Sequence, residues 1–90
     1  MRIIIVDDEM LARGVVREYL SEHADAEVVA ECANGFEAVK AITELSPDLV
    51  FLDVMMPKMN GFQVTEVVRA DRSLDSVKII LLTAKGQECD

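Results

Sequence analysis

PDLVFLDVMMPKMNGF, residues 47–62, is the stretch that decides the fold of this chain. Its apolar run, residues 49–52, ends directly at Asp53, and the loop that follows holds Pro57 and Gly61. A short apolar run without alternation indicates a strand buried on both faces, as in a parallel sheet. The Asp53 carboxylate then lies at the carboxyl edge of that sheet, where open α/β folds gather their functional groups.

Three further apolar runs, residues 3–6, 28–32 and 77–82, are rich in β-branched side chains and predict three more strands. Glu31 interrupts the second of them, so we expect that strand at an edge of the sheet. Helical patterns separate the strands. This alternation predicts a parallel sheet with right-handed crossovers and with helices on both faces.

The helical patterns differ in how clearly they begin and end. The second begins at a predicted N-cap, Asn34, has Glu37 three residues later and stops before Pro47. The third begins after Asn60 and fades into the polar residues 69–76. The first carries an apolar stripe that we expect to face the sheet, made of Ala12, Val15, Val16, Tyr19 and Leu20.

The composition bounds the functions that the chain can have. Its 90 residues allow a single domain, residues 1–90, and 51% hydrophobic with 29% charged residues is typical of a globular chain. The net charge of −8 repels nucleic-acid phosphates and anionic lipid, so we expect this chain alone to bind neither nucleic acid nor a membrane. Residues 3–6 are too short for a signal peptide, and Cys32 and Cys89 have no metal-like spacing, which together favour the reducing cytoplasm.

Polar side chains follow three of the four predicted strands. Asp7 and Asp8 follow the first, Asp53 the third and Thr83 the fourth. If the first and third strands are neighbours, the three carboxylates crowd together, and repulsion raises their pKa values unless a cation lies among them. Mg²⁺, which prefers oxygen ligands, fits such a site. The alternative is that Asp7 and Asp8 only cap the first helix and Asp53 only ends a strand.

Three phrases in this order and spacing resemble the receiver domains of bacterial response regulators in two-component signalling: IIIVDDE at residues 3–9, PDLVFLDVMMPKMNGF at residues 47–62 and KIILLTA at residues 78–84. The resemblance implies a flavodoxin-like α/β fold, here with four strands in the order 2-1-3-4 and three helices. It also implies that Asp53 accepts a phosphoryl group from a histidine kinase or a small phosphodonor in a Mg²⁺-dependent step.

The same resemblance implies roles for the other site residues. Asp8, Asp53 and the backbone carbonyl of Met55 would bind Mg²⁺ directly, and Asp7 would reach the ion through water. Thr83 would be the switch hydroxyl that bonds the phosphoryl group. Gly61 would permit unusual dihedral angles in the loop after Asp53. Such a domain is no enzyme beyond its own phosphorylation and dephosphorylation.

The sequence also departs from the family. A full receiver continues with a fourth helix, a fifth strand and a fifth helix, whereas this sequence ends at Asp90, so we expect a truncated receiver. The apolar run at residues 77–82 would then be a free edge, with Lys78 as its one charge, and this predicts a homodimer by edge pairing or by exchange of elements. Residues 1–53 resemble receivers joined to LytTR-type DNA-binding domains and residues 54–90 those joined to winged helices, which suggests a recombined or engineered chain.

Other functions fit the residues less well. Haloacid-dehalogenase-like phosphatases need a second acid two positions after the nucleophile, where this chain has Met55. Neither GxGxxG nor GxxxxGK[ST] occurs, so the sequence carries no signature of nucleotide binding. The remaining alternative is a receiver fragment that folds and self-associates, or serves as an engineered structural module, without signalling.

Overall fold

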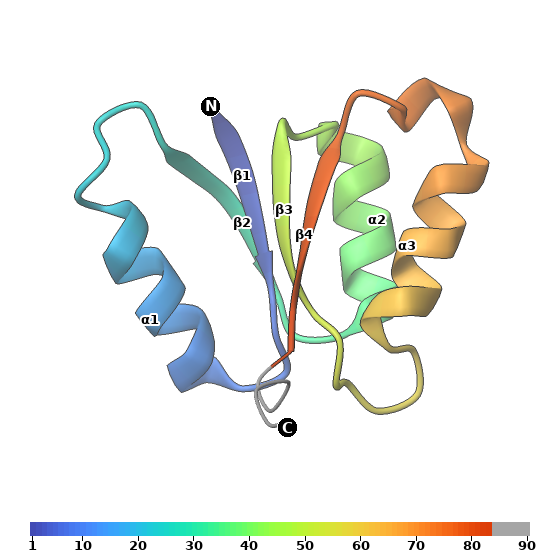
Figure 1. The fold of residues 1–90 in the computed structure, drawn as a ribbon, viewed down its shortest axis with the longest axis horizontal. Coiled ribbons are helices and arrows are strands. Elements are labelled where there is room, and N and C mark those ends of the chain that lie inside the picture. The colour runs from blue at the N-terminus through green and yellow to red at the C-terminus, as the bar shows by residue number, and fades with distance from the viewer. Residues whose placement is uncertain (84–90) are drawn as a thin grey trace.

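The computed structural model describes residues 1–83; residues 84–90, with Cys89 among them, lie outside the described part of the chain. The elements follow the predicted alternation (Figure 1): β1 (Arg2–Val6), α1 (Met10–Leu20), β2 (Glu27–Cys32), α2 (Gly35–Leu45), β3 (Leu49–Asp53), α3 (Gly61–Ala70), the short 3-10 helix η1 (Arg72–Leu74) and β4 (Lys78–Leu82). No helix within residues 1–83 is long and apolar enough to cross a membrane.

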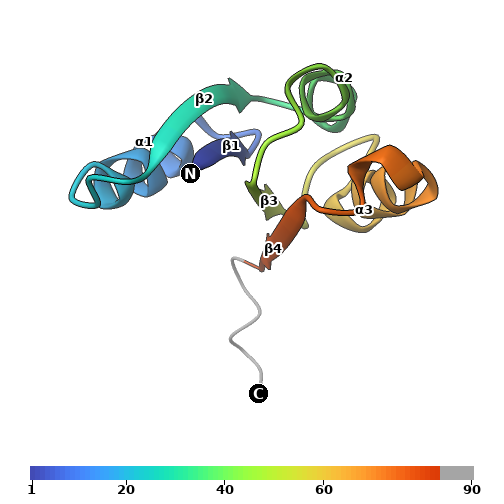
Figure 2. The same cartoon turned by 90° about the horizontal axis from the view of Figure 1, so that it is seen from above.

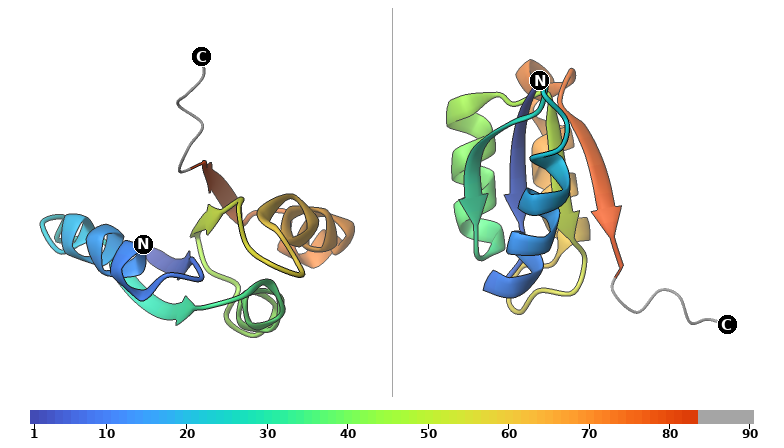
Figure 3. Two further views of the ribbon diagram at one scale, coloured as in Figure 1. Left: turned by 90° about the horizontal axis from the view of Figure 1, so that it is seen from below. Right: turned by 90° about the vertical axis from the view of Figure 1, so that its left-hand side faces the viewer.

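The four strands form one parallel sheet in the order β2-β1-β3-β4. This confirms the predicted flavodoxin-like fold with its 2-1-3-4 order, and β2 lies at an edge, as the interruption by Glu31 indicates (Figure 3). Val6 of β1 lies beside Leu52 of β3. The residues that follow these two, Asp7 and Asp53, therefore leave the sheet at the same level.

Alternate residues of the central strands supply two apolar layers, one on each face of the sheet. On one face Ile4 and Val6 belong to a buried cluster with residues of α2 and α3, including Ile42. On the opposite face Ile3 and Ile5 pack with Leu20 of α1. Figure 2 shows α1 on one side of the sheet and α2 and α3 on the other. β1 is buried on both faces, as its unbroken apolar run predicts, and β3 is buried on one face and half-buried on the other. For β4 the same expectation is wrong, because this strand lies at an edge and its Ile80 is exposed.

Side-chain caps fix where α2 and α3 begin. The Asn34 side chain accepts a hydrogen bond of 2.8 Å from the Glu37 N–H, which confirms the predicted N-cap of α2. At α3 the side chains of Asn60 and Gln63 each accept from the other residue's backbone N–H, a capping box that the sequence analysis did not predict. Both caps lie at the amino-terminal ends of helices that cover the face opposite α1.

The apolar stripe of α1 does not face the sheet as a whole, so that expectation is wrong. Leu20 is buried and Val16 is partly buried against the sheet, whereas Val15 and Tyr19 are 69% and 62% exposed. Val16 and Leu20 lie four residues apart on one line along the helix, and Val15 and Tyr19 lie on the neighbouring line. Within residues 1–83, Leu11 extends this exposed line and is 83% exposed.

This arrangement predicts very different costs for the same substitution at two positions of α1. Leu20→Ala should lower the free energy of unfolding by about 2–5 kcal/mol, because it leaves a cavity against Ile3 and Ile5. Leu11→Ala, the matched control at an exposed position, should change it by less than about 0.5 kcal/mol. Urea unfolding followed by circular dichroism measures both values. Equal costs would contradict the packing of α1 described here.

Candidate functional site

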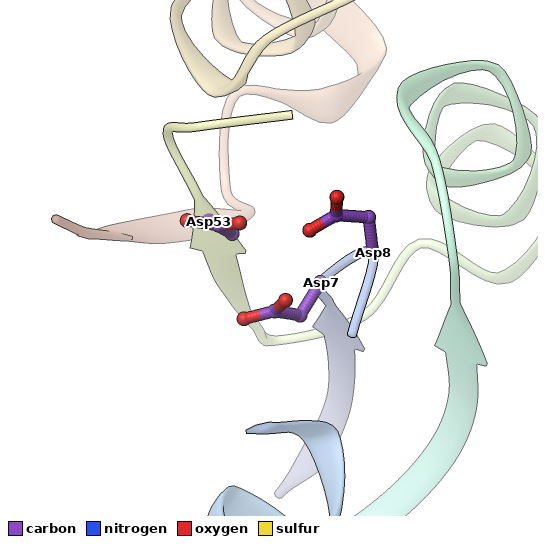
Figure 4. A group of neighbouring side chains, drawn as sticks. All are labelled: Asp7, Asp8 and Asp53. Carbon is purple, nitrogen blue, oxygen red and sulfur yellow. The ribbon is translucent and has the colours of Figure 1, made fainter. Parts of the chain in front are cut away.

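Three aspartate carboxylates gather at the carboxyl edge of the sheet (Figure 4). Asp53 is the last residue of β3, and Asp7 and Asp8 follow β1 directly. One carboxylate oxygen from each residue lies within 4.8 Å of the other two. In Figure 4 the carboxylates of Asp7 and Asp8 point toward the side of the cluster where Asp53 lies. The structure thus brings together the three carboxylates that the sequence singles out.

Asp53 is held from several sides. It is the one charged or polar residue among residues 1–83 whose side chain counts as buried, with 6% of its surface exposed. Its Oδ1 accepts a hydrogen bond of 3.2 Å from the Met55 N–H. The next residue, Val54, donates its N–H to the carbonyl oxygen of Leu82 in β4 at 3.0 Å. These bonds fix both the direction of the carboxylate and the path of the chain after it.

Gly61 brings the start of α3 into direct contact with the Asp53 backbone. A Cβ atom at this position would lie 2.7 Å from the carbonyl oxygen of Asp53 and 2.9 Å from the Cα of Val54. The expectation that Gly61 supplies an unusual dihedral angle is wrong, because none of the glycines in the described residues has a positive φ. The left-handed residue of this loop is Lys58, with φ 70°. Gly61 is needed for its lack of a side chain.

Asp7 serves the local backbone as well as the cluster. Its Oδ1 accepts a hydrogen bond of 2.9 Å from the N–H of Glu9, the residue that precedes α1. This bond closes a turn ahead of α1 and does not cap the helix, whose N-cap residue, Glu9, makes no side-chain capping bond. Within residues 1–83, no backbone N–H donates a hydrogen bond to the Asp8 carboxylate, and Asp8 is exposed. Helix capping alone does not account for the convergence of Asp8 on Asp53.

The crowding of these carboxylates changes their acidity. Burial raises the pKa of Asp53 above its ordinary value; the Met55 N–H opposes this rise, and the charges of Asp7 and Asp8 add to it. The pKa of Asp7 is likewise raised, first by burial and then by Asp8, against the lowering effect of the Glu9 N–H. Within residues 1–83, no Lys or Arg forms an ion pair with any of the three carboxylates. The ionised cluster therefore lacks a counter-charge from the described part of the chain.

The donor atoms of this cluster fit Mg²⁺. All three are carboxylate oxygens, which hard divalent cations prefer. Ligands on opposite sides of an octahedral Mg²⁺ ion lie about 4 Å apart, so oxygens within 4.8 Å of one another need little adjustment to share one ion. A carboxylate that binds the ion through a water molecule needs no change of position. Asp7, Asp8 and Asp53 are therefore the residues that would hold the ion.

Met55 and Thr83 both lie close to Asp53, one along the chain and the other across the sheet. Met55 is two residues beyond Asp53, and its N–H already bonds the carboxylate. Thr83 is exposed and directly follows Leu82, the β4 residue paired with Asp53. The role of the Met55 carbonyl as a metal ligand and that of the Thr83 hydroxyl as a switch stay predictions.

Comparisons with known proteins agree with one another on the family. The family model described as response regulator receiver domain matches residues 3–90. The chain is 40% identical over 88 residues to the chemotaxis protein CheY of Listeria monocytogenes, covering 98% of this chain and 71% of that protein. It is 48% identical over 71 residues to an uncharacterized response regulatory protein of Yersinia pestis, covering 79% of this chain.

Solved structures show the same likeness. The signal receiver domain of the response regulator NarL from Mycobacterium tuberculosis superimposes with a TM-score of 0.85 at 35% identity, over 92% of this chain and 65% of that one. The aligned part of the Yersinia pestis relative is only 30% of its length. The chain therefore spans a minor part of some of its relatives.

The raised pKa values predict how the stability of the protein depends on pH without Mg²⁺. The pKa of Asp53 is higher in the folded than in the unfolded chain, so the folded chain holds more protons between the two pKa values. The free energy of unfolding then falls as the pH rises through that window, and the full loss persists at neutral pH. Asp53→Asn keeps the shape and removes the charge.

In buffer with a chelator, Asp53→Asn should therefore be more stable than the native chain at about pH 7, and the difference should shrink toward about pH 4, where the unfolded carboxyl titrates. Urea unfolding at a series of pH values measures this difference. A variant that is less stable than the native chain at neutral pH, or a difference that does not vary with pH, would contradict the electrostatic account.

Proposed function

Because the chain belongs to the response regulator receiver domain family, we propose that Asp53 accepts a phosphoryl group, from a histidine kinase or a small phosphodonor, in a Mg²⁺-dependent step. Receiver domains serve as phosphoacceptors in signalling, and membership of this family supports the same general role here. The observation that carries the choice of residue is the position of Asp53: it is buried at the end of β3, and its carboxylate lies within 4.8 Å of those of Asp7 and Asp8.

The proposed reaction is a displacement at phosphorus. An Asp53 carboxylate oxygen attacks, and the P–N bond of a phosphohistidine, or the P–O bond of an acyl phosphate, breaks. The leaving imidazole or carboxylate keeps the electron pair of that bond, and the imidazole takes a proton from water. The product is an acyl phosphate on Asp53. A bound Mg²⁺ would supply the neutralisation of the charge that three carboxylates and the phosphoryl oxygens bring together.

The chain's own residues position the nucleophile. The Met55 N–H holds one oxygen of the Asp53 carboxylate, which leaves the other free to attack. Gly61 and the β4 strand both fix the peptide that follows Asp53. Because Thr83 follows the β4 residue paired with Asp53, a short movement of its hydroxyl would reach the phosphoryl oxygens. Positioning and charge neutralisation are the main requirements of phosphoryl transfer.

Incubation with acetyl phosphate and Mg²⁺ tests the proposal. Intact-mass spectrometry of the native chain should show the addition of one phosphoryl group, and Asp53→Asn, the matched control, should show none. A chelator should abolish the addition to the native chain, because the ionised cluster then has no counter-charge. If the native chain gains no mass while it remains folded, the alternative of a receiver-like module that does not signal is the better account.

We also propose that the chain forms a homodimer through the edge of β4. This strand lies at one edge of the described sheet, and its Ile80 is 44% exposed. Lys78 is the only charged residue of the strand, so little protects the edge from pairing with a second copy. A two-fold axis would pair the two β4 strands antiparallel.

Adding a charge to the β4 edge tests the proposed dimer directly. Light scattering coupled to size-exclusion chromatography should find a dimer for the native chain and a monomer for Ile80→Lys, because the added charge opposes edge pairing. Concentration should shift the native equilibrium. A native chain that is monomeric across a wide concentration range would refute the proposal.

A further inference from the structure

Arg13, the fourth residue of α1, reaches back to the loop that carries two of the three carboxylates. Its Nη1 donates a hydrogen bond of 2.7 Å to the carbonyl oxygen of Asp7. Only 16% of the Arg13 side chain is exposed, and its Nε lies 3.4 Å from the carboxylate of Glu31 in β2. A hydrogen bond from a charged donor inside the protein is stronger than one between neutral groups. Arg13 thus ties the loop after β1 to the neighbouring strand.

Both polar groups of the Asp7 backbone are held. The Asp7 N–H donates to the carbonyl oxygen of Cys32, at the end of β2, at 3.0 Å, while its carbonyl accepts from Arg13. The carbonyl of Asp7 and the N–H of Asp8 belong to one planar peptide. Fixing the direction of that carbonyl therefore fixes the peptide plane that holds the Asp8 Cα, the atom from which the Asp8 side chain leaves the backbone.

The position of this guanidinium opposes the local helix dipole. Arg13 lies near the amino-terminal end of α1, where a positive charge is unfavourable. Its Nε–H is buried and makes no hydrogen bond within residues 1–83, although the Glu31 carboxylate lies near it. The side chain therefore makes one hydrogen bond, to the Asp7 carbonyl, and one ion pair, to Glu31. The hydrogen bond is the contact through which Arg13 can act on the loop after β1.

We propose that Arg13 is a positioning residue for the acidic site: it holds the peptide between Asp7 and Asp8, and so keeps the Asp8 carboxylate directed at Asp53. This inference rests on the proposed Mg²⁺-dependent function. Arg13 touches none of the three carboxylates through a hydrogen bond or an ion pair in the described part of the chain. It acts through the backbone of Asp7.

Arg17 provides a matched control. It lies one turn further along α1, and its Nη1 forms an ion pair of 2.6 Å with the same Glu31. Its side chain is 55% exposed, and its hydrogen bonds within residues 1–83 do not include Asp7. Arg13→Met and Arg17→Met change the net charge equally and keep the apolar stem of the side chain. They differ in the contact with Asp7.

The two explanations for an effect of Arg13 predict opposite changes in Mg²⁺ affinity when the residue is replaced. If Arg13 acted only through its charge, its removal would lessen repulsion of a cation, and Mg²⁺ would bind more tightly. If it positions the loop, Mg²⁺ should bind roughly tenfold more weakly to Arg13→Met, as is typical when a group that orients a metal ligand is removed. Arg17→Met should bind within about twofold of the native chain, because its exposed charge is largely screened.

Backbone-amide NMR of the full chain, titrated with Mg²⁺ alone, measures these affinities and reports the Asp8 amide directly. Arg13→Lys keeps the charge but not the planar fork, so its affinity should lie between those of the native chain and Arg13→Met. Should Arg13→Met fail to fold, Arg13→Lys decides: weaker binding than in Arg17→Met supports the inference, and equal binding overturns it.

The remaining outcomes separate this inference from the function on which it rests. A native chain that binds Mg²⁺, together with an Arg13→Met variant that binds it equally well or more tightly, overturns the positioning role alone. A native chain that binds no Mg²⁺ overturns the proposed Mg²⁺-dependent step as well. Urea unfolding without Mg²⁺, measured in parallel, gives the change in the free energy of unfolding for each variant separately from its Mg²⁺ affinity.

Discussion

Repulsion among three carboxylates at one edge of a parallel sheet is the constraint on which the rest of this structure depends. Parallel strands end at the same edge, so β1 and β3, as neighbours, bring Asp7, Asp8 and Asp53 within reach of one ion. In water such groups would separate. Here two buried apolar layers hold the strands, and their burial supplies the free energy that keeps the charges together.

The backbone around the cluster is fixed at several points, and each of them leaves the carboxylates unneutralised. Gly61 lets α3 approach the Asp53 backbone, β4 holds the next residue, and Cys32 and Arg13 hold the Asp7 peptide. Rigid placement combined with unfavourable charge is typical of a site prepared for a cation, because the ion removes the repulsion with little rearrangement of the chain. In the proposed function, a phosphoryl group, with its own negative charge, would need the same cation to approach Asp53.

Much of the fold could be predicted from the sequence because its signals are local. Apolar runs such as residues 49–52 give buried parallel strands. Asn34 begins α2 through its side-chain hydrogen bond, and the helix ends at its C-cap, Ser46, directly before Pro47. The orientation of α1 was harder to predict, because helical spacing alone does not say which of two neighbouring rows of apolar side chains packs against the sheet. Val16 and Leu20 pack inward, whereas Val15 and Tyr19 remain exposed within residues 1–83.

The site could be predicted in part, for the same reason. Asp7, Asp8 and Asp53 follow strands, so the topology alone places them together. Arg13 could not be found, because its hydrogen bond goes to a backbone carbonyl and leaves no motif in the sequence. Gly61 was found as a loop glycine but for the wrong reason, since its close approach to Asp53 depends on tertiary packing.

Titration of Mg²⁺ into the native chain and into Asp8→Asn, followed by calorimetry, tests most directly the claim that the three carboxylates form one cation site. The account predicts binding at a single site in the native chain and clearly weaker binding in the variant, because the exposed Asp8 has no other role among the described residues that the substitution would disturb. Equal affinity in the two proteins would contradict it.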